Sequence, residues 1–155
     1  MEHTKLHEFQ PPKSEWGPGP WNDEPDREDF EHAGFPCFAL RNHWGAWCGY
    51  VGVPPGHPSH GMPYDGVPVE VHGGLTYAAS CNPPICHIPK PGEPDDVWWL
   101  GFDCGHAFDL MPGMVAYARS RGFPALDCGE VYRDLAYVKA EIRSLAEQLP
   151  RLVVP

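Results

Sequence analysis

The sequence predicts one α+β domain, with a small antiparallel sheet of four to six short strands, a C-terminal amphipathic helix and long Pro/Gly-rich loops. Three observations support this prediction. Short apolar segments in the middle of the chain are bounded by turn residues, and one segment near its end has helical periodicity. The 155 residues include 20 prolines and 17 glycines, which predicts much loop. Because the strands precede the helix, a doubly wound βαβ sheet is not expected.

Residues 1–34 differ in composition from the rest of the chain. They are polar, acidic and rich in proline, with no apolar period, so we expect a loosely ordered arm. Trp16 and Trp21 are candidate anchors of this arm. The domain itself is expected to span residues 35–155, because a chain of this length buries enough surface for one core.

Short apolar or alternating segments are predicted to be strands. They are residues 37–41, 44–53, 67–71, 75–78 and 97–102. The alternation of Val67, Val69 and Val71 with other residues indicates a half-buried strand. Gly73 and Gly74 follow it as a two-residue turn in this interpretation, which gives a hairpin.

The last predicted element is an amphipathic helix. Its apolar stripe consists of Leu135, Val138, Ile142, Leu145 and Leu149. Asp134 is expected to cap its N-terminus and Pro150 to end it. The stripe is expected to pack on the domain's own sheet, with a homodimer seam as the alternative. Lys139 and Glu141 then face solvent, and the earlier segment 107–129 is either a broken helix or a loop.

Charge and composition narrow the functional classes. The formal net charge is −10, and no long basic cluster is available to release counterions from a duplex nucleic acid, so that partner is not expected. A small phosphorylated ligand stays open because it needs few cations, and Arg119, Arg121 and Arg133 are candidates. No segment approaches the roughly 18 apolar residues of a membrane span. No signal peptide is visible, so a cytoplasmic protein with reduced cysteines is expected.

Asp103, His106 and Asp109 follow the aromatic segment 97–102 and form a first group of candidate site residues. A carboxylate beside His106 would orient its imidazole for general acid or base catalysis. The alternative is structural, with a capping aspartate and a histidine that bonds to a buried carbonyl. Cys104 is a candidate nucleophile, but burial as a plain hydrophobic side chain is the favoured interpretation.

A second group of candidates surrounds the predicted hairpin. Glu70 and His72 would share one face of a strand, and Gly73 and Gly74 would let a ligand approach the backbone. Thr76 lies just beyond the turn. The remaining candidate ligand contacts are His57, Trp98 and Trp99. The two tryptophan rings would stack on a base or a sugar, or else belong to the core.

The chemistry depends on whether these groups converge. If His72 and His106 meet, the two imidazoles would act as base and acid in phosphoester cleavage without a metal. Zinc or another divalent metal is the alternative cofactor, with His72, Asp103, His106 and Asp109 as its candidate ligands. A softer set for structural zinc consists of Cys81, Cys86, His87 and Cys104.

Four segments carry a resemblance to a known family. They are CGYVGVPPGHP (48–58), VHGGLTYA (71–78), WWLGFDCGHAFD (98–109) and YRDLAYVKAEIRSLAEQL (132–149). They resemble a family of small uncharacterised proteins encoded by bacteriophages and prophages. The resemblance implies a phage or prophage origin and, by analogy of context, action against host defences. It supplies no catalytic residues.

Three functions are open on these grounds. In the first, the protein binds and hydrolyses a nucleotide-like phosphorylated ligand, with His72 and His106 as acid and base and Asp103 orienting one of them. In the second, the same pocket holds the nucleotide without cleaving it. In the third, the acidic arm and the helix inhibit a host protein by contact.

Overall fold

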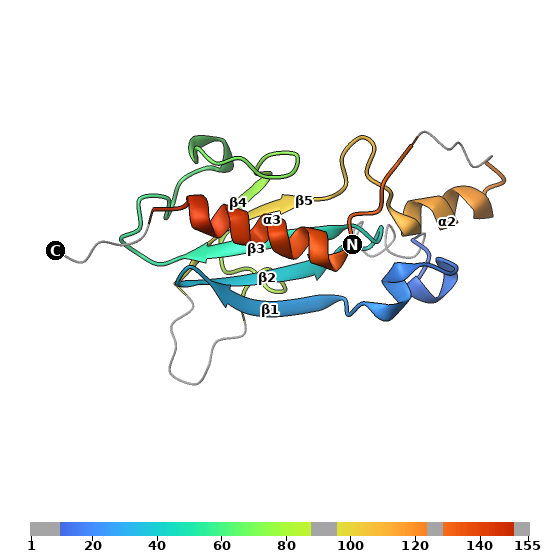
Figure 1. Ribbon diagram of the computed structural model, residues 1–155, viewed down its shortest axis with the longest axis horizontal. Helices are drawn as coiled ribbons and strands as arrows, with labels where there is room; N and C mark the ends of the chain where they lie inside the picture. The colour runs from blue at the N-terminus through green and yellow to red at the C-terminus, as the bar shows by residue number, and fades with distance from the viewer. Residues whose placement is uncertain (1–9, 88–95, 124–128, 151–155) are drawn as a thin grey trace.

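A five-stranded antiparallel sheet forms the centre of the molecule (Figure 1). The structure is a computed structural model and describes residues 10–87, 96–123 and 129–150. The strands are β1 (Arg27–His32), β2 (Phe35–Arg41), β3 (Trp47–Val53), β4 (Tyr77–Ser80) and β5 (Trp98–Asp103), in the spatial order β1-β2-β3-β5-β4. The helices are α2 (Pro112–Ser120) and α3 (Leu135–Gln148), and short 3-10 turns are η1 (Lys13–Glu15), η2 (Pro20–Asp23) and η3 (Tyr64–Gly66). The predicted α+β fold is confirmed.

Helix α3 covers one face of the sheet, and the main core lies between them (Figure 1). Val138, Ile142 and Leu145 are fully buried on the inner side of the helix, so the stripe predicted from the sequence does pack on the chain's own sheet. Gly49 of β3 makes this approach feasible, because an added Cβ would lie 2.6 Å from Cγ1 of Ile142. In the described ranges, no helix is both long enough and apolar enough to cross a membrane.

The opposite face of the sheet carries a smaller aromatic cluster. Phe38, Tyr50 and Trp99 are buried there, with the Phe38 and Tyr50 rings stacked at 4.7 Å between centroids. The guanidinium of Arg27 lies 4.2 Å from the centroid of Phe38 and donates to the carbonyl oxygen of Cys86. The loop after β4 is therefore tied across this face.

That loop contains a disulfide bond between Cys81 and Cys86. The prediction that all cysteines are reduced is wrong for this pair, because the turn of the loop brings their Cα atoms to 4.9 Å, a separation that a disulfide spans. The buried thiols are Cys37, Cys48 and Cys104. Cys128 lies outside the described residues.

The segment predicted as a strand at residues 67–71 is not part of the sheet. It runs along α3, where polar side chains of the helix satisfy its backbone. The Glu70 N–H donates to Oε1 of Gln148 at 2.7 Å, and Nε2 of Gln148 donates to the Glu70 carbonyl at 2.7 Å. Further along, the His72 N–H donates to Oε1 of Glu141 at 2.9 Å. The predicted hairpin is therefore wrong, because helix side chains hold this segment and β4 pairs with β5 instead.

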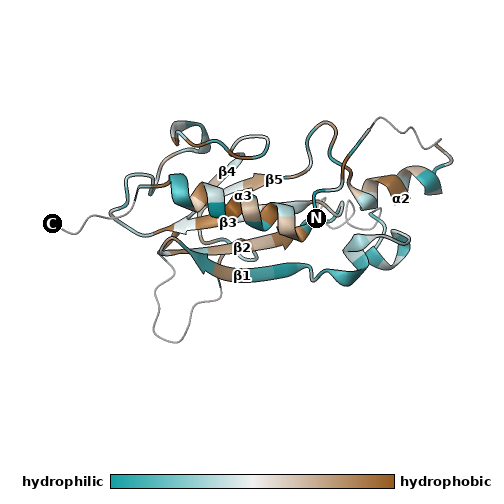
Figure 2. Cartoon of the chain, viewed as in Figure 1, coloured by the Kyte–Doolittle hydropathy of each residue, from teal (hydrophilic) through white to brown (hydrophobic). Residues whose placement is uncertain are grey.

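Strand β1 lies in the segment that composition assigned to an arm. It pairs along its length with β2, and Phe30 packs against the main core. Figure 2 shows β1 as mostly hydrophilic, which is why composition did not reveal an edge strand with few inward residues. Trp16 is buried, and Trp21 packs edge-on against Tyr132 at 5.2 Å, so both rings anchor the N-terminal segment.

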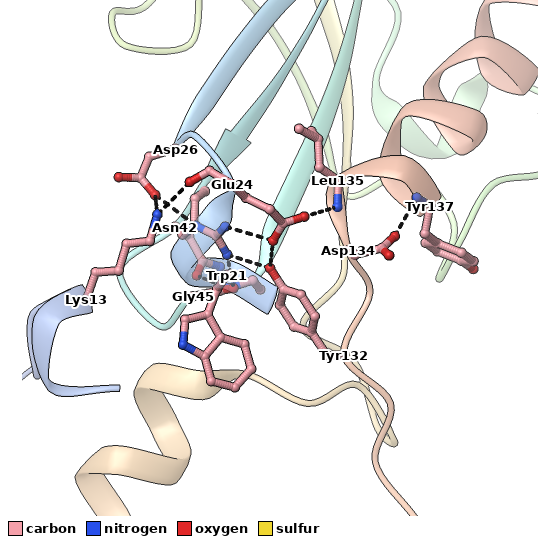
Figure 3. A network of polar contacts seen from close by, with 12 residues as sticks. Lys13, Trp21, Glu24, Asp26, Asn42, Gly45, Tyr132, Asp134, Leu135 and Tyr137 are labelled. Atoms are coloured by element: carbon pink, nitrogen blue, oxygen red, sulfur yellow. Dashed lines mark hydrogen bonds and ion pairs between the residues drawn. The ribbon is translucent and has the colours of Figure 1, made fainter. Parts of the chain in front are cut away.

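A polar network around Arg41 ties this N-terminal segment to the start of α3 (Figure 3). The guanidinium of Arg41 donates to the side chains of Glu24, Asp26 and Tyr132 at 2.9 to 3.2 Å. The other carboxylate oxygen of Glu24 accepts from the Leu135 N–H at 2.6 Å. Because a first-turn N–H has no partner within its helix, Glu24 stabilises the N-terminus of α3.

Candidate functional site

His72 and Asp109 come from distant parts of the chain and form a hydrogen-bonded pair beside the first turns of α3. Nε2 of His72 lies 2.7 Å from Oδ2 of Asp109. The contacts of residues 70–72 with the helix position the histidine, and a tight turn after β5 positions the aspartate. Their side chains are 13% and 1% exposed, respectively, so the pair is largely shielded from water.

Asp109 accepts hydrogen bonds from three directions. Besides His72, its Oδ2 accepts from the His106 N–H at 3.0 Å, and its Oδ1 accepts from Nε of Arg133 at 3.1 Å. Burial opposes ionisation, but these donors outweigh it, and the pKa of Asp109 is lowered from its ordinary value. Because a carboxylate only accepts, Nε2 of His72 carries the proton that faces it.

Tyr137 extends this pair into a chain of three side chains. Its hydroxyl lies 2.7 Å from Nδ1 of His72. In the neutral imidazole, whose one proton is on Nε2, Nδ1 accepts from the hydroxyl. Asp134 caps α3 by accepting from the Tyr137 N–H at 2.8 Å, as predicted, and the ring turns away from Glu24 (Figure 3). The guanidinium of Arg133 lies 4.9 Å from the centroid of the Tyr137 ring.

Sequence reasoning missed Tyr137 and Glu141 as site residues. Glu141 was predicted to face solvent, whereas its carboxylate binds the His72 N–H. The available signal was their spacing of four residues, which places both on one side of a helix. A polar stripe that holds a loop has the same pattern as a solvated stripe, so the sequence did not separate the two cases.

Asp103 and His106 form a second pair next to the first. Oδ1 of Asp103 lies 3.4 Å from Nε2 of His106, and the two side chains are 32% and 36% exposed. This contact is electrostatic only, because Nε2 of His106 is buried and has no hydrogen-bond partner among the described residues. The Asp103 carboxylate instead accepts from the Gly105 N–H at 2.9 Å and from Oγ1 of Thr76 at 3.1 Å. The ring centroids of His72 and His106 are 6.1 Å apart. The structure therefore brings together both candidate histidines, with one carboxylate on each.

Two glycines and one strained residue shape the edge of this site. Gly73 has a φ of +67°, and an added Cβ would lie 2.3 Å from the imidazole of His106. Gly74 has a φ of +78° with nothing within 4 Å of such a Cβ, and its N–H donates to the Val71 carbonyl at 2.8 Å. Phe108, in the turn closed by the bond from the Asp109 N–H to the His106 carbonyl, also has a positive φ of 71°.

The structure places four other candidates away from these pairs. His57 is buried and its Nδ1 accepts from the Ser59 N–H at 3.0 Å. Trp99 is fully buried in the aromatic cluster. Trp98 donates to the Met62 carbonyl at 3.0 Å and begins β5, about 16 Å from the end that carries Asp103. The backbone of Glu70 is bound to the far end of α3. None of the four takes part in the contacts of the two pairs.

The arrangement of the candidate ligand side chains does not support either of the two predicted metal sites. Within the described ranges, no three His, Cys, Asp or Glu side chains are arranged to hold a metal ion. The softer set is dispersed, because Cys81 and Cys86 are joined to each other and Cys104 is buried beside Trp47. Burial raises the pKa of Cys104, which disfavours a thiolate nucleophile. A divalent metal stays a prediction.

No family model, curated protein or solved structure matches this chain. The phage resemblance accordingly stays a prediction. The geometry of the two Asp–His pairs is the basis on which a function is assigned.

Proposed function

We propose that this site binds a small nucleotide-like phosphorylated ligand and hydrolyses a phosphoester bond in it by general acid–base catalysis. The observation that carries the proposal is the pair of imidazoles 6.1 Å apart, each with its own carboxylate. The hydrogen bond from Asp109 fixes the orientation of His72, which then serves as the base, and His106 beside Asp103 serves as the acid. On the phage resemblance, the ligand would be a host defence signal.

The surroundings of the two rings suit a phosphorylated ligand. Arg133 lies 3.1 Å from Asp109 and offsets its negative charge. The buried carboxylate therefore repels an incoming phosphate less than an isolated anion would. The space beside Gly74, where nothing lies within 4 Å of an added Cβ, gives a ligand room at this edge.

Replacement of each histidine tests the proposal. With a panel of cyclic mononucleotides and dinucleotides, we expect His72→Asn and His106→Asn each to lower turnover by about 10²- to 10⁴-fold. His60→Asn is the matched control, because His60 contacts the Asp96 carbonyl and the Trp98 ring instead. Wild-type turnover in both site variants would contradict the proposal.

One observation favours a second candidate, a protein that retains the nucleotide without cleaving it. Both ring nitrogens of His72 are bonded to other side chains, which suits a rigid binding pocket as well as it suits catalysis. This function predicts stoichiometric binding and recovery of the intact nucleotide after denaturation. Recovery of cleaved nucleotide would exclude it.

A further inference from the structure

Tyr137 has a position that acid–base catalysis by two histidines does not use. Its hydroxyl, the imidazole of His72 and the carboxylate of Asp109 form one continuous chain, with 2.7 Å at each of the two junctions. Hydroxyl, base and orienting carboxylate within hydrogen-bond reach are the signature of an activated nucleophile. Both ring nitrogens of His72 are already bonded, one to Asp109 and the other to Tyr137. His72 can therefore act on a ligand only through the Tyr137 hydroxyl.

The donor and acceptor order along Tyr137, His72 and Asp109 agrees with a nucleophilic role for Tyr137. Asp109 is an acceptor only, so Nε2 of His72 carries a proton, and in the neutral imidazole that a general base requires Nδ1 then holds the lone pair that faces Tyr137. The hydroxyl therefore donates to the imidazole, which is the arrangement in which a base withdraws the proton of a nucleophile. Burial and the neighbouring Glu141 raise the pKa of Tyr137, so the hydroxyl is protonated at rest and needs this base.

We propose that Oη of Tyr137 is the nucleophile of the phosphoester hydrolysis, with His72 as its general base. The inference rests on the proposed function. Oη forms a bond to phosphorus as the bond from phosphorus to the leaving oxygen breaks. The tyrosine proton moves to Nδ1 of His72, and the protonated imidazole of His106 gives a proton to the leaving oxygen. Asp109 stabilises the imidazolium of His72, and Arg133 over the ring stabilises negative charge on the tyrosine.

Water completes the reaction in a second step. Neutral His106 takes one proton from a water molecule as the water oxygen attacks phosphorus, and the bond from phosphorus to Oη breaks. His72 returns its proton to Tyr137. The site regains its starting protonation state, and the net reaction consumes one water for each phosphoester bond.

Trapping the covalent adduct tests this inference. The probe is thymidine 5′-(4-nitrophenyl) phosphate, quenched with acid because a phosphotyrosyl bond survives acid, and the full-length protein is analysed by intact mass and peptide mapping. We expect an adduct of one thymidylyl group on Tyr137 and more of it in His106→Asn, in which the second step is slow. In Tyr137→Phe the adduct is absent, and turnover falls by at least about 100-fold.

Two further measurements separate the possible failures. Tyr64→Phe, at an exposed tyrosine outside the site, should keep the adduct and the turnover. Wild-type turnover in Tyr137→Phe without an adduct would overturn the nucleophile and leave the two-histidine hydrolase standing. No turnover of this probe or of the nucleotide panel by the wild-type protein would overturn both. Equal midpoints of thermal unfolding for wild type and Tyr137→Phe exclude misfolding as the cause of lost turnover.

Discussion

Two polar clusters flank the N-terminal end of α3, and they differ in what they leave open to solvent. The Arg41 network (Glu24, Asp26, Arg41 and Tyr132) surrounds a guanidinium that is only 2% exposed and donates in four directions. The candidate site has an equally buried centre in Asp109, at 1% exposure, but its outer member His106 is 36% exposed.

The difference separates a stabilising role from a chemical one. In the Arg41 network the central charge is enclosed by its partners, which suits an anchor between the N-terminal segment and α3. In the site, the buried carboxylate fixes groups whose outer members can meet a ligand. Substitutions in the first cluster should therefore reduce stability alone, whereas substitutions in the second should affect turnover more than stability.

Arg41→Met should give the largest loss of stability. The substitution leaves Glu24 and the Gly45 carbonyl without their buried donor, and we expect the free energy of unfolding to fall by about 3 to 5 kcal/mol. Urea denaturation measures this loss. Lys139→Met is the control, because Lys139 forms a more exposed pair with Glu28 and should cost about 1 kcal/mol or less. Equal losses in the two variants would show that the Arg41 network is no anchor.

Asp109→Asn should cost less stability but most of the activity. The amide lacks the charge that orders His72 and Arg133, so we expect a loss of about 1 to 3 kcal/mol and a fall in turnover of at least about 100-fold. A variant that keeps wild-type turnover would remove Asp109 from the mechanism.

The stability cost of Asp109→Asn should also depend on pH. The pKa of Asp109 is lowered in the folded protein from an ordinary value of 3.8, so its carboxylate stabilises the fold above about pH 4 and this contribution is lost as the pH falls further. The difference in unfolding free energy between wild type and variant should be full near pH 7 and shrink below pH 4. A constant difference over that range would contradict the ionised, bonded state of Asp109.

Much of the fold was predictable because it depends on local patterns. The stripe from Leu135 to Leu149 has a helical period and a capping aspartate, and both features act within one element. The segment 67–71 alternates like a strand, yet Glu141 and Gln148 bind its backbone from the helix. That outcome depends on contacts between residues about 70 positions apart, which no local pattern contains.

Comparison of Gly73→Ala with Gly74→Ala should separate the effect of displacing His106 from the effect of backbone strain. Both residues have a positive φ, so each alanine should cost about 1 to 2 kcal/mol. Only at Gly73 does the added Cβ lie 2.3 Å from the imidazole of His106. Displacement of that ring should lower turnover by about 100-fold, while Gly74→Ala stays close to wild type. Equal turnover in the two variants would show that the position of His106 does not matter.

Phe108→Gly should have the smallest effect, and it should be stabilising. Phe108 has a φ of 71° and is 66% exposed, so glycine relieves the strain at little cost in buried surface. Relief of about 1 to 2 kcal/mol of left-handed strain exceeds the entropy cost of about 0.5 to 1 kcal/mol of a new glycine, so we expect a gain of at most about 1 kcal/mol in unfolding free energy, measured by thermal denaturation. A loss of stability would mean that the ring packs more than its exposure indicates.

The site was predictable in part. Asp103, His106 and Asp109 stand close together in a segment that follows a strand, and His72 stands beside two glycines, so residue type and spacing identified them. Trp98 and Trp99 have rings that suit stacking on a ligand, but Trp98 lies at the opposite end of β5 from Asp103 and Trp99 is buried in the aromatic cluster. Tyr137 was missed because its role depends on the tautomer of a histidine 65 residues away, which sequence does not specify.

Helix α3 belongs at once to the core, through Ile142, and to the candidate site, through Tyr137. A ligand that bridges Tyr137 and the segment around Gly73 would bind the folded chain and not the unfolded one. By mass action, a ligand at 100 times its dissociation constant adds about 2.7 kcal/mol to stability. A thermal-shift screen of metabolite libraries can therefore find the ligand whatever its chemical class, because the element that binds it also holds the sheet together.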